Sequence, residues 1–129
     1  MKWYINKSKP ICPQICEHMC VAINLGEFAP NEKVYSVREL SLLIGVTPNT
    51  VQKAYDMLYE MNIIYSVPGA GWFVCENTNA CTKRVEALVN EKIEEYFNNM
   101  ESIGFSKEKA TLLLQERVGK TNEWITKMC

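Results

Sequence analysis

Cysteine is the residue type with the most evident chemistry in this chain of 129 residues, which contains six cysteines. Cys12, Cys16 and Cys20 recur every four residues, so a helix would carry them along one side. Such a stripe suits a soft metal or a redox sensor. Against this, neighbouring positions on a helix suit a disulfide poorly, no CxxC pair occurs, and His18 lies off the stripe. We therefore expect these thiols to pack as small apolar side chains, with a sensor as the alternative.

Other residues with catalytic chemistry are sparse. His18 is the single histidine, and no arrangement of Ser, Cys or Asp completes a catalytic triad around it. Residues 119–121 resemble the end of a phosphate loop, but Leu114 stands where that loop needs its first glycine. The sequence therefore predicts no enzyme, no cofactor and no metal site.

Hydrogen-bonding side chains mark the boundaries of two short helices. Ser36 and Glu39 have the spacing of a capping box, and Leu40, Leu43 and Ile44 then form one apolar face. Gly45 suits the left-handed end of that helix. Thr47 as N-cap and Pro48 at the first helical position open the second helix. Two such helices joined by a glycine turn predict a helix-turn-helix over about residues 36–60.

The second helix has one apolar face and one polar face. Its apolar residues, at i, i+3, i+4 and i+7, are Val51, Ala54, Tyr55 and Leu58. Small polar and amide side chains at its start can enter a major groove, although the same residues are also typical of a solvated surface. The Gln52 amide suits adenine, and the Lys53 ammonium suits guanine or phosphate. Thr47 and Thr50 would hold backbone phosphate.

The flanking segments complete a winged helix over residues 1–75. Apolar residues at every fourth position predict a helix over residues 10–24, followed by a loop over residues 27–35. β-prone residues on both sides of the turn at 68–71 predict a hairpin over residues 63–75, which would be the wing.

The rest of the chain reads as a polar linker, residues 76–82, and a helical tail, residues 83–129. One face of the first tail helix carries Val85, Leu88, Val89, Ile93, Tyr96, Phe97 and Met100. Ser106 caps a last helix, with Ala110, Leu113 and Leu114 turned inward. The winged helix is too small to cover this apolar face, so we expect a second subunit to cover it. The predicted fold class is mainly α with a small β-hairpin: a winged helix-turn-helix followed by a two-helix dimerisation tail.

Charge and hydropathy restrict the partners. The net charge is −1, and residues 1–75 balance six Lys/Arg against six Asp/Glu, whereas phosphate binding usually rests on a basic surface. Lys33, Arg38, Lys53 and the helix N-termini would have to supply the local positive charge. No apolar run approaches the ~20 residues of a membrane span, and the first residues lack the apolar segment of a signal peptide. We therefore expect a cytoplasmic protein with reduced thiols and no membrane contact.

An ordered run of motifs resembles the GntR family of bacterial transcription regulators. Residues 10–15 are similar to P-I-Y-x-Q-I, residues 26–30 to G-x-L-x-P, and residues 36–40 to S-x-R-E-L. Residues 45–55 resemble the recognition helix, and residues 69–74 resemble the wing, G-x-G-T-F-V. The resemblance implies a repressor that binds a double-stranded DNA operator as a homodimer. The residues it implies at the DNA are Ser36, Arg38, Thr47, Pro48, Asn49, Thr50, Gln52, Lys53, Gly69 and Gly71.

The short tail is similar to that of the YtrA-like subgroup. Only 54 residues follow Cys75, too few for the large effector domains of other members. The resemblance implies that this tail serves dimerisation and that the regulated operon contains transporter genes. A small-molecule effector is compatible with the sequence but not identified by it. Aromatic side chains would either line a pocket between subunits or simply form core and dimer contacts: Trp72, Tyr96, Phe97 and Trp124.

The wing departs from the family pattern. Val67, Pro68 and Ala70 occupy places where the family usually has Arg or Lys, and Trp72 replaces a threonine. These departures favour an alternative function, in which the protein has lost tight DNA binding. It would then be a winged-helix protein-interaction module or a cysteine-based metal or redox sensor.

Overall fold

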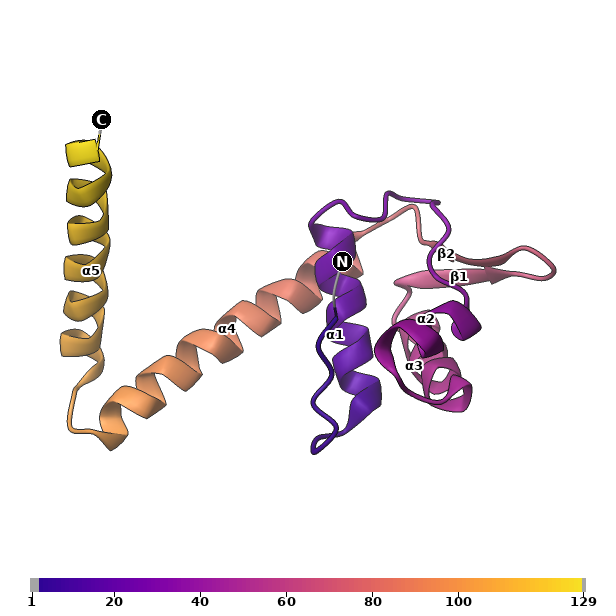
Figure 1. Cartoon of the computed structure of the whole chain (residues 1–129), viewed down its shortest axis with the longest axis horizontal. Coiled ribbons are helices and arrows are strands. Elements are labelled where there is room, and N and C mark those ends of the chain that lie inside the picture. The colour runs from indigo at the N-terminus through magenta and orange to yellow at the C-terminus, as the bar shows by residue number, and fades with distance from the viewer. Residues whose placement is uncertain (1–2, 129) are drawn as a thin grey trace. The chain divides into compact units, whose positions relative to one another are not determined.

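The computed structural model describes the backbone of residues 3–128 and the side chains of residues 3–119. These described residues form five helices and one two-stranded antiparallel hairpin. Their order, shown in Figure 1, is α1 (Ile11–Asn24), α2 (Val37–Ile44), α3 (Pro48–Glu60), β1 (Ile64–Val67), β2 (Gly71–Val74), α4 (Asn79–Ser102) and α5 (Lys107–Met128). The predicted class, mainly helical with a small hairpin in a winged-helix order, is confirmed. Two compact units divide the chain, residues 1–87 and 88–129.

The core of the first unit lies where α1, α3 and the hairpin meet. Both α1 and α2 pack against α3. The four-residue spacing in α1 turns Ile15 and Met19 fully inward, as the apolar pattern predicts. They join one cluster with Leu58 of α3 and with Ile64 and Val74 of the hairpin.

The prediction that Leu40, Leu43 and Ile44 form the apolar face of α2 is wrong at one position. Leu40 is buried, but Leu43 is 63% exposed. The buried neighbour is instead Ser41, whose hydroxyl donates a 2.6 Å hydrogen bond to the carbonyl oxygen of Val46. A satisfied hydroxyl can be buried at low cost, and an eight-residue helix has room for few inward positions.

The segment expected as a plain loop, residues 27–35, lies along the outer edge of β2. The amide of Val34 donates to Trp72 O over 2.9 Å, and the amide of Val74 donates to Glu32 O over 2.9 Å. Lys33 forms an isolated bridge with Phe73. The segment therefore protects the edge of the hairpin, which two strands alone would leave unpaired.

Helix α4 begins at Asn79, four residues earlier than expected, so the end of the expected linker is helical. The Asn77 side-chain oxygen accepts the amide of Asn79 over 2.9 Å. Cys81 is buried and donates its thiol to Cys20 O over 3.0 Å. The polar composition of this segment predicts a linker. It does not show the cap at Asn77 or the contact of Cys81 with α1.

Helix α5 begins as its sequence predicts. The Ser106 hydroxyl accepts the amide of Lys109 over 3.2 Å. Ala110, one turn later, is fully buried as expected, but Leu114 is 47% exposed, so its expected inward position is wrong. Within residues 3–128, no helix has the length and apolar character that crossing a membrane requires.

Candidate nucleic-acid interface

The start of α2 is held by reciprocal hydrogen bonds. Ser36 Oγ accepts the amide of Glu39, and the Glu39 carboxylate accepts the amide of Ser36, each over 3.0 Å. These bonds lower the pKa of Glu39 because they favour its charged form. The capping box predicted from the sequence is present. It places Arg38 in the first turn of α2, where its side chain is exposed.

The turn between the two helices matches its sequence signals. Gly45 has a φ of 70°, which an L side chain adopts only under strain. Thr47 Oγ1 then accepts the amide of Thr50 over 3.3 Å, and the two hydroxyls lie 2.9 Å apart. Pro48 occupies the first turn of α3. These contacts fix the direction in which α3 begins.

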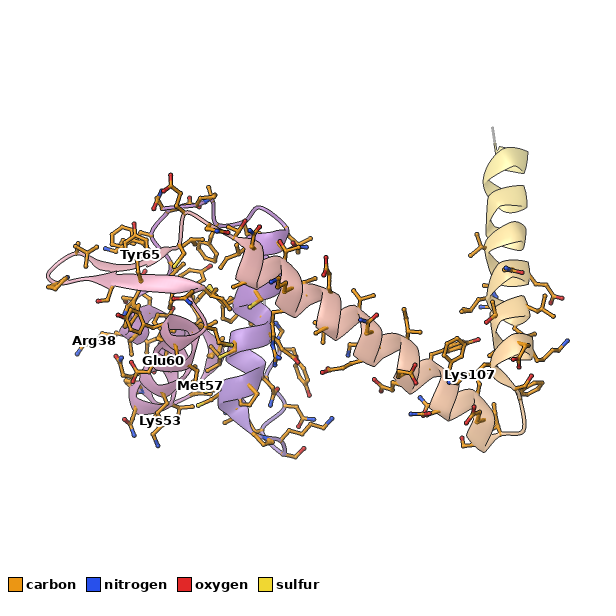
Figure 2. All side chains as sticks on the ribbon, turned by 180° about the vertical axis from the view of Figure 1, so that it is seen from behind. Arg38, Lys53, Met57, Glu60, Tyr65 and Lys107 are labelled. Carbon is orange, nitrogen blue, oxygen red and sulfur yellow. The ribbon has the colours of Figure 1, made fainter. Side chains whose placement is uncertain are left out.

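Helix α3 is buried on one side and exposed on the other. Val51, Ala54, Tyr55 and Leu58 have no exposed surface. Asn49 and Lys53 are exposed, as is Asp56. Figure 2 shows Arg38 and Lys53 projecting outward from the winged helix.

Gln52 is half-buried and already has a partner. Its Nε2 donates to the carboxylate of Asp56 over 2.9 Å, one turn along α3. An amide has two N–H donors and one oxygen, so one donor and the acceptor are left for a base edge. The bond to Asp56 holds the amide in one orientation, which suits a bidentate contact.

The wing is an uncharged hairpin. Its strands pair from Ile64 opposite Val74 to Val67 opposite Gly71. The amide of Ala70 closes the turn on Val67 O over 2.9 Å. Gly69 and Gly71 have φ values of 79° and 124°, so both positions favour glycine.

Trp72 anchors the wing to α3. Its ring meets those of Tyr55 and Tyr59 edge-to-face, with centroids 5.6 and 6.3 Å apart. The Tyr55 hydroxyl donates to Tyr35 O over 2.7 Å, and burial raises the pKa of Tyr55. In the described part of the chain, Trp72 is thus a packing residue of the winged helix. The side chain of Trp124 lies outside the described residues.

The cysteine stripe packs α1 onto α3. Cys12 donates its thiol to Thr50 O over 3.5 Å, and Cys16 donates to Ala54 O over 3.6 Å. Burial raises the pKa of Cys16 to about 11, so its thiol stays protonated and weakly reactive. Among the described residues, no group of three His, Cys, Asp or Glu side chains is arranged to hold a metal. The contacts support the packing interpretation.

Comparison with known proteins identifies the family. Residues 13–74 match the bacterial regulatory proteins of the gntR family. The HTH-type transcriptional repressor YtrA of Bacillus subtilis is 33% identical over 124 residues, which cover 90% of this chain and 94% of that protein. The transcriptional regulator YhcF of the same organism is 30% identical over 102 residues, covering 79% of this chain and 84% of that protein. The chain belongs to the GntR family.

Within the GntR family this regulator is YtrA-like, as its short tail predicts. A solved GntR-family transcriptional regulator from Listeria monocytogenes has a TM-score of 0.75 at 31% identity, covering 87% of this chain and 98% of that one. The chain is therefore a DNA-binding helix-turn-helix transcription regulator. Because the GntR family consists of regulators, the prediction that this chain is not an enzyme is confirmed.

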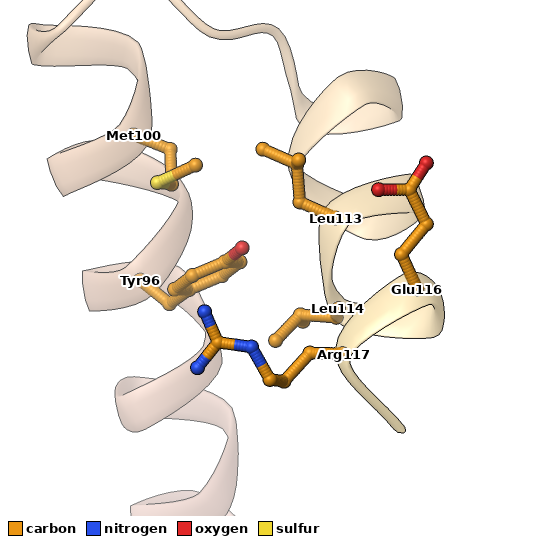
Figure 3. Close-up of a pocket in the computed structure, with 6 residues that line it drawn as sticks. All are labelled: Tyr96, Met100, Leu113, Leu114, Glu116 and Arg117. Carbon is orange, nitrogen blue, oxygen red and sulfur yellow. The ribbon is translucent and has the colours of Figure 1, made fainter. Parts of the chain in front are cut away.

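In the described part of the tail of this GntR-family protein, residues of α4 contact residues of α5. The Tyr96 hydroxyl donates to Ala110 O over 2.9 Å, and the Lys107 ammonium lies 5.8 Å from the centre of the Phe97 ring. A cavity of about 360 Å³ lies between α4 and α5. Figure 3 shows the residues that line it, Tyr96, Met100, Leu113, Leu114, Glu116 and Arg117. The remaining residues of the expected dimer face differ in burial. Val85 packs against the core of the first unit, Leu88 is half-buried, and Val89 and Ile93 are 50% and 46% exposed.

Sequence patterns did not predict that the N-terminal arm, residues 3–9, reaches the helix-turn-helix. Gln14 accepts the amide of Asn6 over 2.8 Å, and His18 Nε2 lies 2.8 Å from Tyr4 O. The arm brings the Lys7 ammonium to 3.7 Å from the position a Cβ would take on Gly45. Nothing in the local pattern of an arm predicts which turn it contacts, so only the structure adds this cation to the surface.

Proposed function

We propose that this GntR-family regulator is a homodimeric repressor, acting in the cytoplasm, that binds the operator of a bacterial operon. Its Bacillus subtilis relative is named a transcriptional repressor, which supports repression as the effect on transcription. Its resemblance to the YtrA-like subgroup supports transporter genes as the regulated operon.

The observation that carries the proposal is the one-sided burial of α3. Its inner residues have no exposed surface, while Asn49 and Lys53 face outward beside a well-capped N-terminus. A helix held in this way can lie in a major groove without losing its packing. Arg38 projects from the neighbouring helix, so phosphate and base contacts would come from one surface. The residues proposed to contact DNA are Ser36, Arg38, Thr47, Pro48, Asn49, Thr50, Gln52, Lys53, Gly69 and Gly71.

The tail supports the homodimer. Val89 and Ile93 are about half exposed on α4, and Leu112 and Val118 are exposed on α5. Apolar surface of this kind is stabilised when a second copy covers it. A twofold dimer would present two recognition helices to half-sites one or more helical turns apart.

The test is a selection from random DNA duplexes, followed by titration of the enriched sequence with variants of the full chain. Gln52→Ala should weaken binding by about 1–3 kcal/mol and relax the choice at one base position, because one bidentate contact is lost. Arg38→Ala should weaken binding to all sequences. Lys109→Ala, which removes an exposed charge from the tail, is the matched control.

The uncharged wing tip, residues 67–71, favours a second candidate, a winged-helix module that binds protein instead of DNA. The same experiment separates the two functions. If no sequence is enriched and Arg38→Ala leaves duplex binding unchanged, operator binding is wrong and the interaction module takes its place.

A further inference from the structure

The wing tip carries no cation, but a lysine from another part of the chain lies across the wing. Lys33 belongs to the segment that pairs with the outer edge of β2. The amide of Asn31 donates to Val74 O over 2.8 Å, and the amide of Val34 donates to Trp72 O over 2.9 Å. These bonds hold Lys33 opposite Phe73.

Gly71 is the place where the Lys33 side chain crosses the hairpin. A Cβ on Gly71 would lie 2.9 Å from Lys33 Cε and 3.6 Å from its Nζ. Gly71 and Phe73 are two residues apart on β2, so they share a face of the hairpin. The opposite face carries Trp72, which packs on Tyr55. The Lys33 ammonium therefore lies on the outer face of the wing, in the space that a side chain at position 71 would occupy.

The charge of Lys33 also acts on Glu39, in the first turn of α2. The pKa of Glu39 is lowered first by its hydrogen bonds with Ser36 and, to a smaller extent, by the positive charge of Lys33. Glu39 is part of the capping box that positions Arg38. Lys33 thus lies on the outer face of the wing, its charge acts on the first turn of α2, and its side chain is exposed.

We propose that Lys33 is a phosphate-binding residue that replaces the missing cations of the wing, and that Gly71 belongs to this site because it leaves room for the lysine. This inference rests on the proposed operator binding. An ammonium binds phosphate as a point charge and carries no base preference. Its contribution should therefore be equal for all DNA sequences and should depend on salt.

The test titrates Lys33→Met and Lys33→Arg against the selected operator and a random duplex at several salt concentrations. Met keeps the stem over Gly71 and removes the charge, whereas Arg keeps the charge. We expect Lys33→Met to lower the affinity for both duplexes by the same factor, about three- to tenfold. It should also reduce the slope of log K against log salt by about 0.9. Lys33→Arg should retain the wild-type slope. Lys109→Met is the matched loss of a lysine in the tail and should change neither quantity.

Gly71→Ala adds a second, independent measurement. The new methyl group would displace the flexible end of Lys33 and so weaken DNA binding. The loss should be smaller in a Lys33→Met background, because the charge is already absent there. Urea unfolding of each variant separates this effect from backbone strain at the positive φ of position 71.

The outcomes distinguish this inference from the proposed function. A wild-type chain that binds no duplex overturns both. A wild-type chain that binds its operator, with affinity and salt slope unchanged in Lys33→Met, overturns the role of Lys33 and leaves operator binding intact. Loss of stability in Lys33→Met without loss of affinity would show that the lysine acts on Glu39 alone, which also overturns the phosphate site. Weaker binding to the operator but not to random DNA would show base recognition instead.

Discussion

Apolar residues make up about half of residues 1–87 and about two fifths of residues 88–129, and the two units bury them very differently. In the winged helix, Ile15, Val51 and Leu58 have no exposed surface. In the tail, Ala110 is the one buried side chain among the described residues 88–119. Half of the surface of Val89 is exposed. The first unit therefore encloses its own core, and the second does not.

This difference shows how the two units obtain their stability. Inside the winged helix, three helices and a hairpin cover one another, so each apolar side chain finds partners within the same chain. Two tail helices present apolar stripes that are wider than the contact between them, and the uncovered part favours association. Stability should thus be intrinsic in the winged helix and dependent on protein concentration in the tail.

The largest expected effect compares one leucine from each unit. Leu58→Ala should lower the free energy of unfolding by about 2–5 kcal/mol, because it leaves a cavity in a fully packed core. Leu112→Ala removes the same atoms from a side chain that is 52% exposed, and should cost less than about 1 kcal/mol in the monomer. Urea unfolding at two protein concentrations measures both. If both substitutions lowered the free energy of unfolding of the monomer by the same amount, the two units would not differ in how they bury their apolar side chains.

The next effect concerns association through α4. Ile93→Glu places a charge on the half-exposed apolar face and should weaken self-association at least tenfold, about 1.4 kcal/mol. Asn98→Glu introduces the same charge at an exposed position on the other side of the helix and should leave association unchanged. Sedimentation at several concentrations measures the equilibrium. Equal behaviour of the two variants would place the dimer contact elsewhere.

The smallest effect compares the two serine caps. Ser36 takes part in two reciprocal hydrogen bonds, whereas Ser106 accepts one longer bond. Ser36→Ala should destabilise the winged helix by about 1 kcal/mol, and Ser106→Ala should cost less because it removes one longer bond. Thermal unfolding followed by circular dichroism measures both changes.

The Ser36 cap should also depend on pH. Its hydrogen bonds with Ser36 depress the pKa of Glu39 in the folded chain, so its contribution is present at neutral pH and is lost as pH falls through that lowered pKa. The difference in stability between wild type and Glu39→Gln should therefore be largest near neutral pH and shrink in acid. A difference that stays constant down to pH 3 would mean that the carboxylate charge plays no part in the cap.

Local sequence patterns predicted much of the winged helix. The Ser36 and Thr47 caps and the Gly45 turn involve contacts within a few residues. Such contacts depend on residue types at fixed spacing, which the sequence displays directly. The order of these motifs was also enough to predict the family. The residues proposed to contact DNA follow from that same order, and they remain predictions.

Patterns were less informative where burial depends on distant partners. Leu43 fits the apolar face of α2 by spacing, but Ser41 is buried because Val46 accepts its hydroxyl hydrogen bond. Helix α4 begins four residues early, and Cys81 in its first turn contacts Cys20, a residue 61 positions away. Periodicity describes one helix at a time, so it contains no information on which neighbour covers each position.

By itself, the sequence determined the elements of this regulator and their order, because capping, helix periodicity and turn formation are short-range. The sequence named Lys33 as a source of local positive charge, but the tertiary structure alone decided where Lys33 and Lys7 lie. Lys7 lies beside Gly45, and Lys33 crosses Gly71, although each lysine comes from a segment without a motif of its own. Their positions follow from the packing of an arm on α1 and from the pairing of residues 31–34 with β2. Contacts between residues so far apart in the chain exist only after the core has formed.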